Sequence, residues 1–228
     1  MEGVMHMKTI GIIGAMEEEI IALRRRIELR EIHQIAGMDF YEATMKDAQV
    51  IVVRCENGKV NAAICTQILI DRFKANYIMN IGVAGGLHPD VNIGDVIIAS
   101  DIDMPADTNC EVENVFWETD KRLIGCAKEV ADKVLKEHQV WIGHIESQDE
   151  FAASVKIKEE PYSTFTAFYA EMEGAAIAHT CYMNKIPFVM LRTISDRADN
   201  GIEMNFDDFV NLAARQVSKM IEGIVEYI

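Results

Sequence analysis

The sequence has no long hydrophobic run and comparatively few basic residues. Half of its 228 residues are hydrophobic, but no apolar stretch approaches the roughly 18 consecutive residues that a membrane span needs. The chain holds 22 Lys and Arg against 37 Asp and Glu, which gives a formal net charge of -15. Nucleic acids and anionic membranes are bound through basic patches, so this composition argues against both as partners.

Paired cysteine motifs are also absent. The five cysteines are an odd number without CxxC or CxxH spacing, and the six histidines are scattered. This pattern is typical of reduced thiols in a cytoplasmic protein and argues against a disulfide framework or a metal site. Residues 1–7 hold no apolar segment of the kind that secretory signals contain, so we interpret them as an N-terminal extension.

The chain does contain apolar strand segments that alternate with helical segments. Strands are expected at 8–13, 37–45, 48–54, 77–81, 95–100, 140–145, 165–172 and 187–192, and helices at 17–27, 60–70, 121–137, 173–179 and 206–227. The polar stretch 101–120 has no clear period and is expected to form an excursion or lid. This alternation predicts an α/β fold in which residues 8–228 form one domain around a central mixed β-sheet flanked by helices.

The segment Gly11–Glu19 reads as the end of a strand, a tight turn and a helix whose first turn holds three glutamates. A helix N-terminus at this edge of a sheet usually suits an anion, but three carboxylates would repel a phosphate. Gly11 and Gly14 lack the third glycine of the dinucleotide fingerprint, and no Walker lysine is present. Complementation of the helix dipole would also explain these glutamates.

Charged residues stand at the ends of several expected strands, and the glycine run Gly82–Gly86 ends another. The charged residues are Glu19, Glu171, Glu173, Arg192 and Asp196. If the sheet brings these ends together, one pocket would hold several carboxylates and an arginine, which suits a polyhydroxylated, uncharged ligand. Solvation of strand ends would explain each acid taken singly, and Glu171 and Glu173 share a side only if the backbone is still extended there.

Together these segments resemble the methylthioadenosine/S-adenosylhomocysteine nucleosidases of the nucleoside phosphorylase superfamily. The matching segments keep the same order over nearly the whole chain: Gly11–Glu19, Gly58–Val60, Asn80–Leu87, Glu171–His179, Arg192–Asp196 and Phe206–Phe209. The resemblance implies a nucleoside phosphorylase-like fold, a homodimer, and hydrolysis of 5′-modified adenosines to adenine and the 5′-substituted ribose. It also implies a place in methionine salvage and no cofactor.

The resemblance further implies roles for individual residues. Glu19 matches the base that activates the attacking water, and Asp196 matches the acid that protonates purine N7. Glu173 matches the acid that holds the ribose hydroxyls, and Arg192 the arginine near the water. Further substrate-binding positions are Gly85 and Met172 on the ribose side, Phe151 and Ala152 at adenine, Phe206 at the 5′ substituent, and Glu171 and Ser195 in the matching segments. An acid at N7 and nearby carboxylates would stabilise the charges that develop as the glycosidic bond breaks.

Several positions depart from the family pattern. Val83 stands where the family usually has a serine, and Asn57 places an amide where an alkyl side chain usually lines the 5′ subsite. The 101–120 excursion is shorter than usual. These departures keep open another nucleoside substrate, such as aminodeoxyfutalosine or 5′-deoxyadenosine. A nucleoside phosphorylase and a ligand-binding homologue without turnover are further alternatives.

Overall fold

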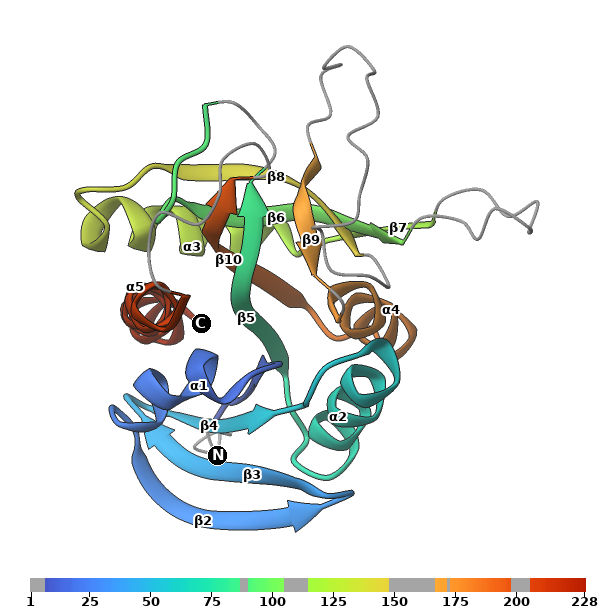
Figure 1. The fold of residues 1–228 in the computed structure, drawn as a ribbon. Coiled ribbons are helices and arrows are strands. Elements are labelled where there is room, and N and C mark those ends of the chain that lie inside the picture. Colours follow the sequence, from blue (N-terminus) through green and yellow to red (C-terminus); the bar gives the residue numbers. More distant parts are fainter. Residues whose placement is uncertain (1–6, 87–89, 105–114, 148–166, 172, 198–205) are drawn as a thin grey trace.

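The computed structural model describes residues 7–86, 90–104, 115–147, 167–171, 173–197 and 206–228. Within them the chain forms a ten-stranded mixed sheet in the order β2-β3-β4-β1-β5-β10-β6-β8-β9, with β7 paired to β6 (Figure 1). The strands are β1 (Thr9–Gly14), β2 (Glu28–Ile35), β3 (Met38–Met45), β4 (Ala48–Arg54), β5 (Tyr77–Gly86), β6 (Val96–Met104), β7 (Val115–Glu118), β8 (Val140–Ser147), β9 (Ala167–Glu171) and β10 (Phe188–Arg197). The helices are α1 (Glu17–Arg24), α2 (Lys59–Asp71), α3 (Lys121–Val134), α4 (Gly174–Asn184) and α5 (Phe206–Tyr227).

The centre of the sheet is parallel. Strand β1 pairs in parallel with β4 and β5, and β5 pairs in parallel with β10, so the carboxyl ends of these strands meet at one edge. The antiparallel pairing of β10 with β6 makes the sheet mixed. The sheet curls so that β9 also contacts β5, although β10, β6 and β8 stand between these two strands in the strand order (Figure 1). This confirms the α/β fold with a central mixed sheet.

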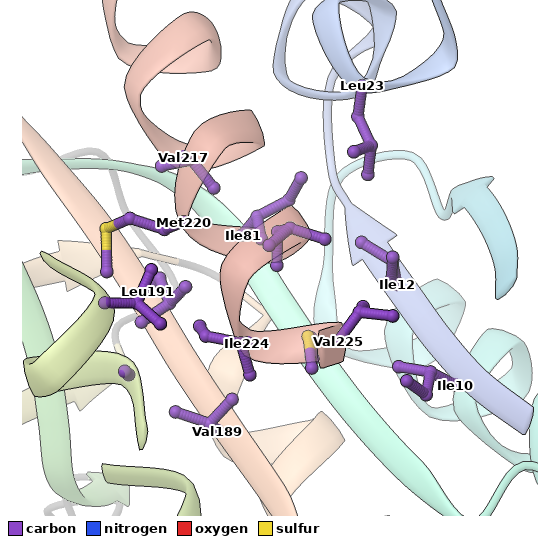
Figure 2. Packing of buried hydrophobic residues seen from close by; sticks show 14 of the residues in the cluster. Ile10, Ile12, Leu23, Ile81, Val189, Leu191, Val217, Met220, Ile224 and Val225 are labelled. Carbon is purple, nitrogen blue, oxygen red and sulfur yellow. The ribbon is translucent and has the colours of Figure 1, made fainter. Parts of the chain in front are cut away.

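Helices cover both faces of the sheet. Helices α1, α3 and α5 pack together on one face, and α2 packs against α4 on the other (Figure 1). Figure 2 shows how α5 fits the first face, where Met220 and Ile224 lie among Ile10, Ile81 and Leu191 of the strands. Full burial of each such side chain contributes about 1.5–3 kcal/mol. From Ala213 to Val225, where the side chains are described, the apolar spacing that predicted an amphipathic helix corresponds to the buried face of α5.

Several elements differ from the expectation. Strand β2 was not predicted, because it lies at the sheet edge with mostly exposed side chains and so lacks an apolar alternation. The stretch 101–120 is not irregular at its ends, since β6 continues to Met104 and pairs there with β7; residues 105–114 lie outside the described part. Helix α1 ends at Arg24, three residues before the predicted end. None of the described helices is long and apolar enough to cross a membrane.

Candidate active site

Glu19 is a buried carboxylate in the first turn of α1, with 7% of the residue exposed. Its Oε2 accepts hydrogen bonds from the backbone N–H groups of Ala15, at 2.7 Å, and Met16, at 3.0 Å. Its Oε1 accepts one from the backbone N–H of Val83 on β5, at 3.2 Å. The turn after β1 and the end of β5 thus hold the carboxylate between them. Such a group has a fixed position, which a catalytic base needs.

The surroundings of Glu19 have opposing effects on its pKa. Burial raises the pKa of Glu19 above its ordinary value, while the guanidinium of Arg192 and the three backbone N–H groups act to lower it. Arg192 lies on β10 opposite Gly82 of β5, and only 2% of it is exposed. The sequence left open whether these ends come together. In the structure a Cβ on Gly82 would lie 2.6 Å from Glu19 Oε1 and 3.4 Å from Arg192 Nη1, so both side chains border the same point of β5. The result is a carboxylate with increased proton affinity beside a fixed positive charge.

Asn80 is a site residue that the sequence did not single out. Its side chain is 1% exposed, and its Oδ1 accepts a hydrogen bond of 2.5 Å from Arg192 Nη2. Its Nδ2 donates to the carbonyl oxygen of Ile13 at 3.0 Å. Asn80 opens the matching segment Asn80–Leu87, but the resemblance assigned it no role, and one asparagine in an apolar strand fits no hydrophobic period.

Glu173 lies at the start of α4, with 6% of the residue exposed. Its Oε1 accepts a 2.7 Å hydrogen bond from the backbone N–H of Gly58, which has φ +105° and introduces α2. A glycine at this position adopts such a φ without strain. Glu173 has φ -121° and ψ -32°, so the backbone leaves the extended conformation at this residue, where α4 begins. The backbone of Glu171 closes β9, and its side chain is outside the described part.

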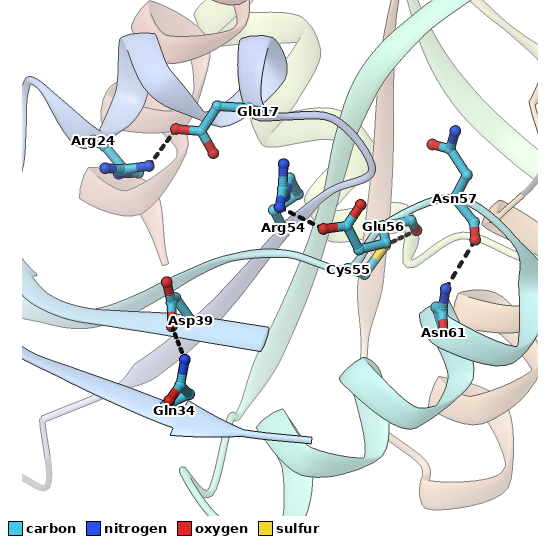
Figure 3. A network of polar contacts seen from close by, with 9 residues as sticks. All are labelled: Glu17, Arg24, Gln34, Asp39, Arg54, Cys55, Glu56, Asn57 and Asn61. Carbon is cyan, nitrogen blue, oxygen red and sulfur yellow. Dashed lines mark hydrogen bonds and ion pairs between the residues drawn. The ribbon is translucent and has the colours of Figure 1, made fainter. Parts of the chain in front are cut away.

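Cys55 connects the two acids electrostatically. It is fully buried at the end of β4, and its Sγ donates to the carbonyl oxygen of Glu56 at 3.2 Å (Figure 3). Burial raises the pKa of the Cys55 thiol, and the carboxylates of Glu173 and Glu19 raise it further. Cys55 is therefore a neutral thiol that lies within electrostatic range of both carboxylates. Glu19, Glu173 and Arg192, all predicted from the sequence, thus gather in one place.

Two of the departures from the family pattern lie on the rim of this site. Asn57 is exposed, and its carbonyl oxygen accepts a 3.0 Å hydrogen bond from Asn61 Nδ2, while its own amide points away from Asn61 (Figure 3). Val83 is half-buried and packs against Ala213 of α5. A small pocket next to Glu19 is lined by Ile81, Gly82, Val83, Ala213, Ala214 and Val217.

Of the other predicted site residues, Ser195 is placed with its side chain, and the rest are placed through their backbone or not at all. Ser195 Oγ donates to the carbonyl oxygen of Ala84 at 3.2 Å, and a register shift next to it sets Asp196 opposite Gly85. Asp196 therefore stands at the same edge of the sheet as Glu19, although its side chain is outside the described part. The same holds for the side chain of Phe206, whose backbone begins α5. Phe151, Ala152 and Met172 lie outside the described residues.

Within the described part, one group of side chains has the spacing of metal ligands. It consists of Glu31, His33 and Glu42 on β2 and β3. These strands form one end of the sheet, away from β5 and β10. The group is therefore not part of the site around Glu19.

Comparison with known proteins places this geometry in a family. The model of the phosphorylase superfamily matches residues 9–226. A 5′-methylthioadenosine/S-adenosylhomocysteine nucleosidase of Staphylococcus aureus is 38% identical over 229 residues, covering 95% of this chain and 98% of the relative.

Solved structures show the same relationship. The nucleosidase of the same name from Campylobacter jejuni superposes with a TM-score of 0.87 at 31% identity, over 98% of this chain and 100% of the other. The futalosine hydrolase of Helicobacter pylori gives 0.85 at 31% identity, over 97% and 98%. The chain belongs to the 5′-methylthioadenosine/S-adenosylhomocysteine nucleosidase family within the phosphorylase superfamily.

Proposed function

We propose that this protein is an N-glycosidic hydrolase that cleaves 5′-methylthioadenosine and S-adenosylhomocysteine into adenine and the 5′-substituted ribose. The observation that carries this proposal is the Glu19 carboxylate, which is buried, held by backbone N–H groups and faced by Arg192. A carboxylate with this environment is suited to take a proton from water. The family to which the chain belongs supports the substrate class.

Each step of the reaction is assigned to a residue near the carboxyl edge of the sheet. Glu19 takes the proton of the attacking water, and Arg192 lies beside it. Asp196 donates a proton to N7 of the leaving adenine, which neutralises the charge that develops on the base. Glu173 accepts hydrogen bonds from ribose hydroxyls and stabilises the oxocarbenium character of the sugar. No described step requires a metal or an organic cofactor.

Hydrolysis is favoured over phosphorolysis by the charge at the attacking side. Glu19 brings a carboxylate to the position that an incoming phosphate would have to approach, and like charges at short range repel strongly where water is excluded. Water is neutral and carries no such penalty. The proposal therefore includes independence from phosphate.

A second candidate substrate differs from the first in its 5′ substituent. Asn57 presents an exposed amide beside Gly58, whose N–H binds Glu173. A polar side chain suits a polar 5′ substituent better than a thioether. The likeness to the futalosine hydrolase of H. pylori fits the same alternative, namely a futalosine-type nucleoside.

We also propose a cytoplasmic homodimer in which residues 8–228 form one domain. Apolar side chains are exposed on the neighbouring helices α2 and α4, where Val60 is 73% exposed and Tyr182 and Met183 are each 68% exposed. A pair of packed helices that leaves large apolar side chains exposed along its length suits a protein interface.

The cysteines support the cytoplasmic part of this proposal. Buried free thiols at Cys55, Cys65 and Cys181 fit a reducing compartment.

The test is adenine release from 5′-methylthioadenosine, S-adenosylhomocysteine, adenosine, 5′-deoxyadenosine and aminodeoxyfutalosine, each with and without phosphate. We expect phosphate-independent release that is fastest with the two thio-substituted nucleosides. Release that is fastest with aminodeoxyfutalosine would transfer the assignment to the second candidate. Release that requires phosphate would contradict hydrolysis, and no release from any of the five would contradict the proposal.

A further inference from the structure

Asn80 links the three strands that carry the site. It lies on β5, opposite Ile13 of β1 and Met190 of β10. Its Nδ2 donates to the carbonyl oxygen of Ile13 at 3.0 Å, and its Oδ1 accepts from Arg192 Nη2 at 2.5 Å. Both ends of the amide are thus engaged across strands. With 1% of the residue exposed, the amide is shielded from water.

The burial of this amide calls for an explanation. The neighbours of Asn80 along β5 are Met79 and Ile81, both buried members of the apolar core. An apolar residue of similar size would fill position 80 without the desolvation cost of a buried amide. The two hydrogen bonds offset this cost only while both partners stay in place. The asparagine is therefore explained by what it holds rather than by packing.

What it holds is the guanidinium beside Glu19. Arg192 Nη2 is bound by Asn80, and Nη1 donates to the carbonyl oxygen of Leu191 at 3.2 Å. A Cβ on Gly82 would lie 3.4 Å from Arg192 Nη1 and 2.6 Å from Glu19 Oε1, so both groups border the same point on β5. Asn80 lies two residues before that point in the strand.

We propose that Asn80 is a positioning residue, which fixes the guanidinium of Arg192 so that its charge stays beside the Glu19 carboxylate. Asn80 does not touch the reacting atoms and acts through Arg192. The inference rests on the proposed function, in which Glu19 is the base.

The groups that face Glu19 give this role a measurable consequence. The positive charge of Arg192 on β10 stabilises the ionised form of Glu19. Two other groups are near: Cys55, which follows β4 and is a neutral thiol, and Glu173, which precedes α4 and adds negative charge near that thiol. Burial raises the pKa of Glu19, and Arg192 is the largest influence that lowers it. A guanidinium released from Asn80 spends less time beside Glu19, so the pKa of Glu19 should rise further.

The experiment is the pH profile of kcat/KM for adenine release by Asn80→Leu. We expect the acidic limb to move up by about one pH unit, which lowers the rate on that limb about tenfold. Asn80→Ser keeps a polar side chain, but one too short to reach from Ile13 to Arg192. It should shift the acidic limb of the pH profile in the same direction, and it replaces the leucine variant if that variant does not fold. An unmoved limb, or one that moves to lower pH, would overturn the inference.

Two further comparisons separate positioning from general destabilisation. Asn76 Oδ1 accepts from the backbone N–H of Thr9 at 2.9 Å and so also joins β1 to the β5 segment, away from Glu19. Asn76→Ala should lower the thermal stability without moving the pH limb. In the Arg192→Lys background, Asn80→Leu should have little further effect on the limb, because its target is already altered. An equal shift in that background would show that Asn80 does not act through Arg192.

Separate measurements test the positioning role of Asn80 and the proposed function. Adenine release by the unaltered protein tests the function, irrespective of Asn80. The ionisation of Glu19 can also be followed without turnover, by infrared titration of its carboxylate with Glu19→Gln as the reference. We expect Asn80→Leu to raise that titration midpoint, while Asn76→Ala leaves it unchanged. Equal midpoints in the unaltered protein and in these two variants would overturn the positioning role.

Discussion

Gly82 provides the space that the Glu19 carboxylate occupies. A Cβ on Gly82 would lie 2.6 Å from Glu19 Oε1, closer than a carbon can approach, and 3.2 Å from its Cδ, which is a tight contact. Gly82 directly precedes Val83, whose backbone N–H binds the same oxygen. The glycine therefore lets the end of β5 approach the carboxylate closely enough for that hydrogen bond.

Gly82→Ala should reduce activity much more than stability. The methyl group pushes the Glu19 carboxylate out of its hydrogen-bonded position, and the fold adjusts at a cost of about 1–3 kcal/mol. Misplacement of the base by about 1 Å lowers kcat roughly a hundredfold. Adenine release and urea unfolding measure the two effects. Gly125→Ala is the matched control, because a Cβ there meets nothing within 4 Å; this change in α3 should stabilise by about 0.5–1 kcal/mol and leave kcat unchanged.

Glu19→Gln should lower kcat by a factor of about 10²–10⁴, since the amide cannot accept a proton from water. In the unaltered protein, activity should fall as the pH decreases through the pKa of Glu19, which burial raises above its ordinary value of 4.5. Steady-state rates over pH measure both effects. Glu18→Gln removes a neighbouring exposed carboxylate and should leave the profile in place. Equal losses in the two variants would contradict the role of Glu19.

Much of the fold could be predicted because its central strands are continuous apolar segments. The segment that became β4 is apolar over nearly its whole length, and the glutamates after β1 mark the start of α1. The exposed edge strand β2 could not be predicted, because the hydrogen bonds to β3 that define it leave no trace in hydrophobic periodicity. The same limit applies to β7, four residues long within a polar stretch.

The site could be predicted as far as its residues belong to motifs. Glu19, Glu173 and Arg192 are charged residues at strand ends, and burial of charge there indicates function. Asn80 has no such mark, because its importance depends on Arg192, which is 112 residues away in sequence. The backbone N–H groups that hold Glu19 are invisible in sequence for a different reason, since every residue but proline has one.

His144 forms a charged group with two aspartates at the β6–β8 pair. Its Nδ1 lies 2.7 Å from Asp101 Oδ2, and its Nε2 lies 3.2 Å from Asp103 Oδ1. Burial opposes the charge on the imidazole, but the hydrogen bond to Asp101 and the ion pair with Asp103 outweigh it and raise the pKa of His144 to about 9. The hydrogen bond from His144 also lowers the pKa of Asp101.

The free energy of unfolding should therefore decrease as the pH rises from 6.5 to about 9. Because the folded chain binds the imidazole proton more tightly, the contribution of His144 is full below its ordinary pKa and is lost as the pH passes the raised one. The contribution of Asp101 is full above its ordinary pKa of 3.8 and is lost in acid. Urea unfolding across this range should show a flatter dependence for His144→Gln. His179→Gln, which removes an exposed imidazole stacked on Trp117, is the control and should retain the slope.

Asn57→Leu should improve binding of the thio-substituted substrates. Asn57 stands at the predicted 5′ subsite and is exposed, so exchange of its amide for an alkyl side chain removes a desolvation cost and adds apolar contact with a methylthio group. A change of this size in a binding pocket is worth about 1–3 kcal/mol, so KM for 5′-methylthioadenosine should fall about tenfold or more while kcat stays the same. Adenosine, with only a hydroxyl at the 5′ position, is the internal control, and its KM should not fall. If KM for both nucleosides stays unchanged, Asn57 does not line the 5′ subsite. A rise in KM for the thioether alone would mean that the amide contributes to its recognition.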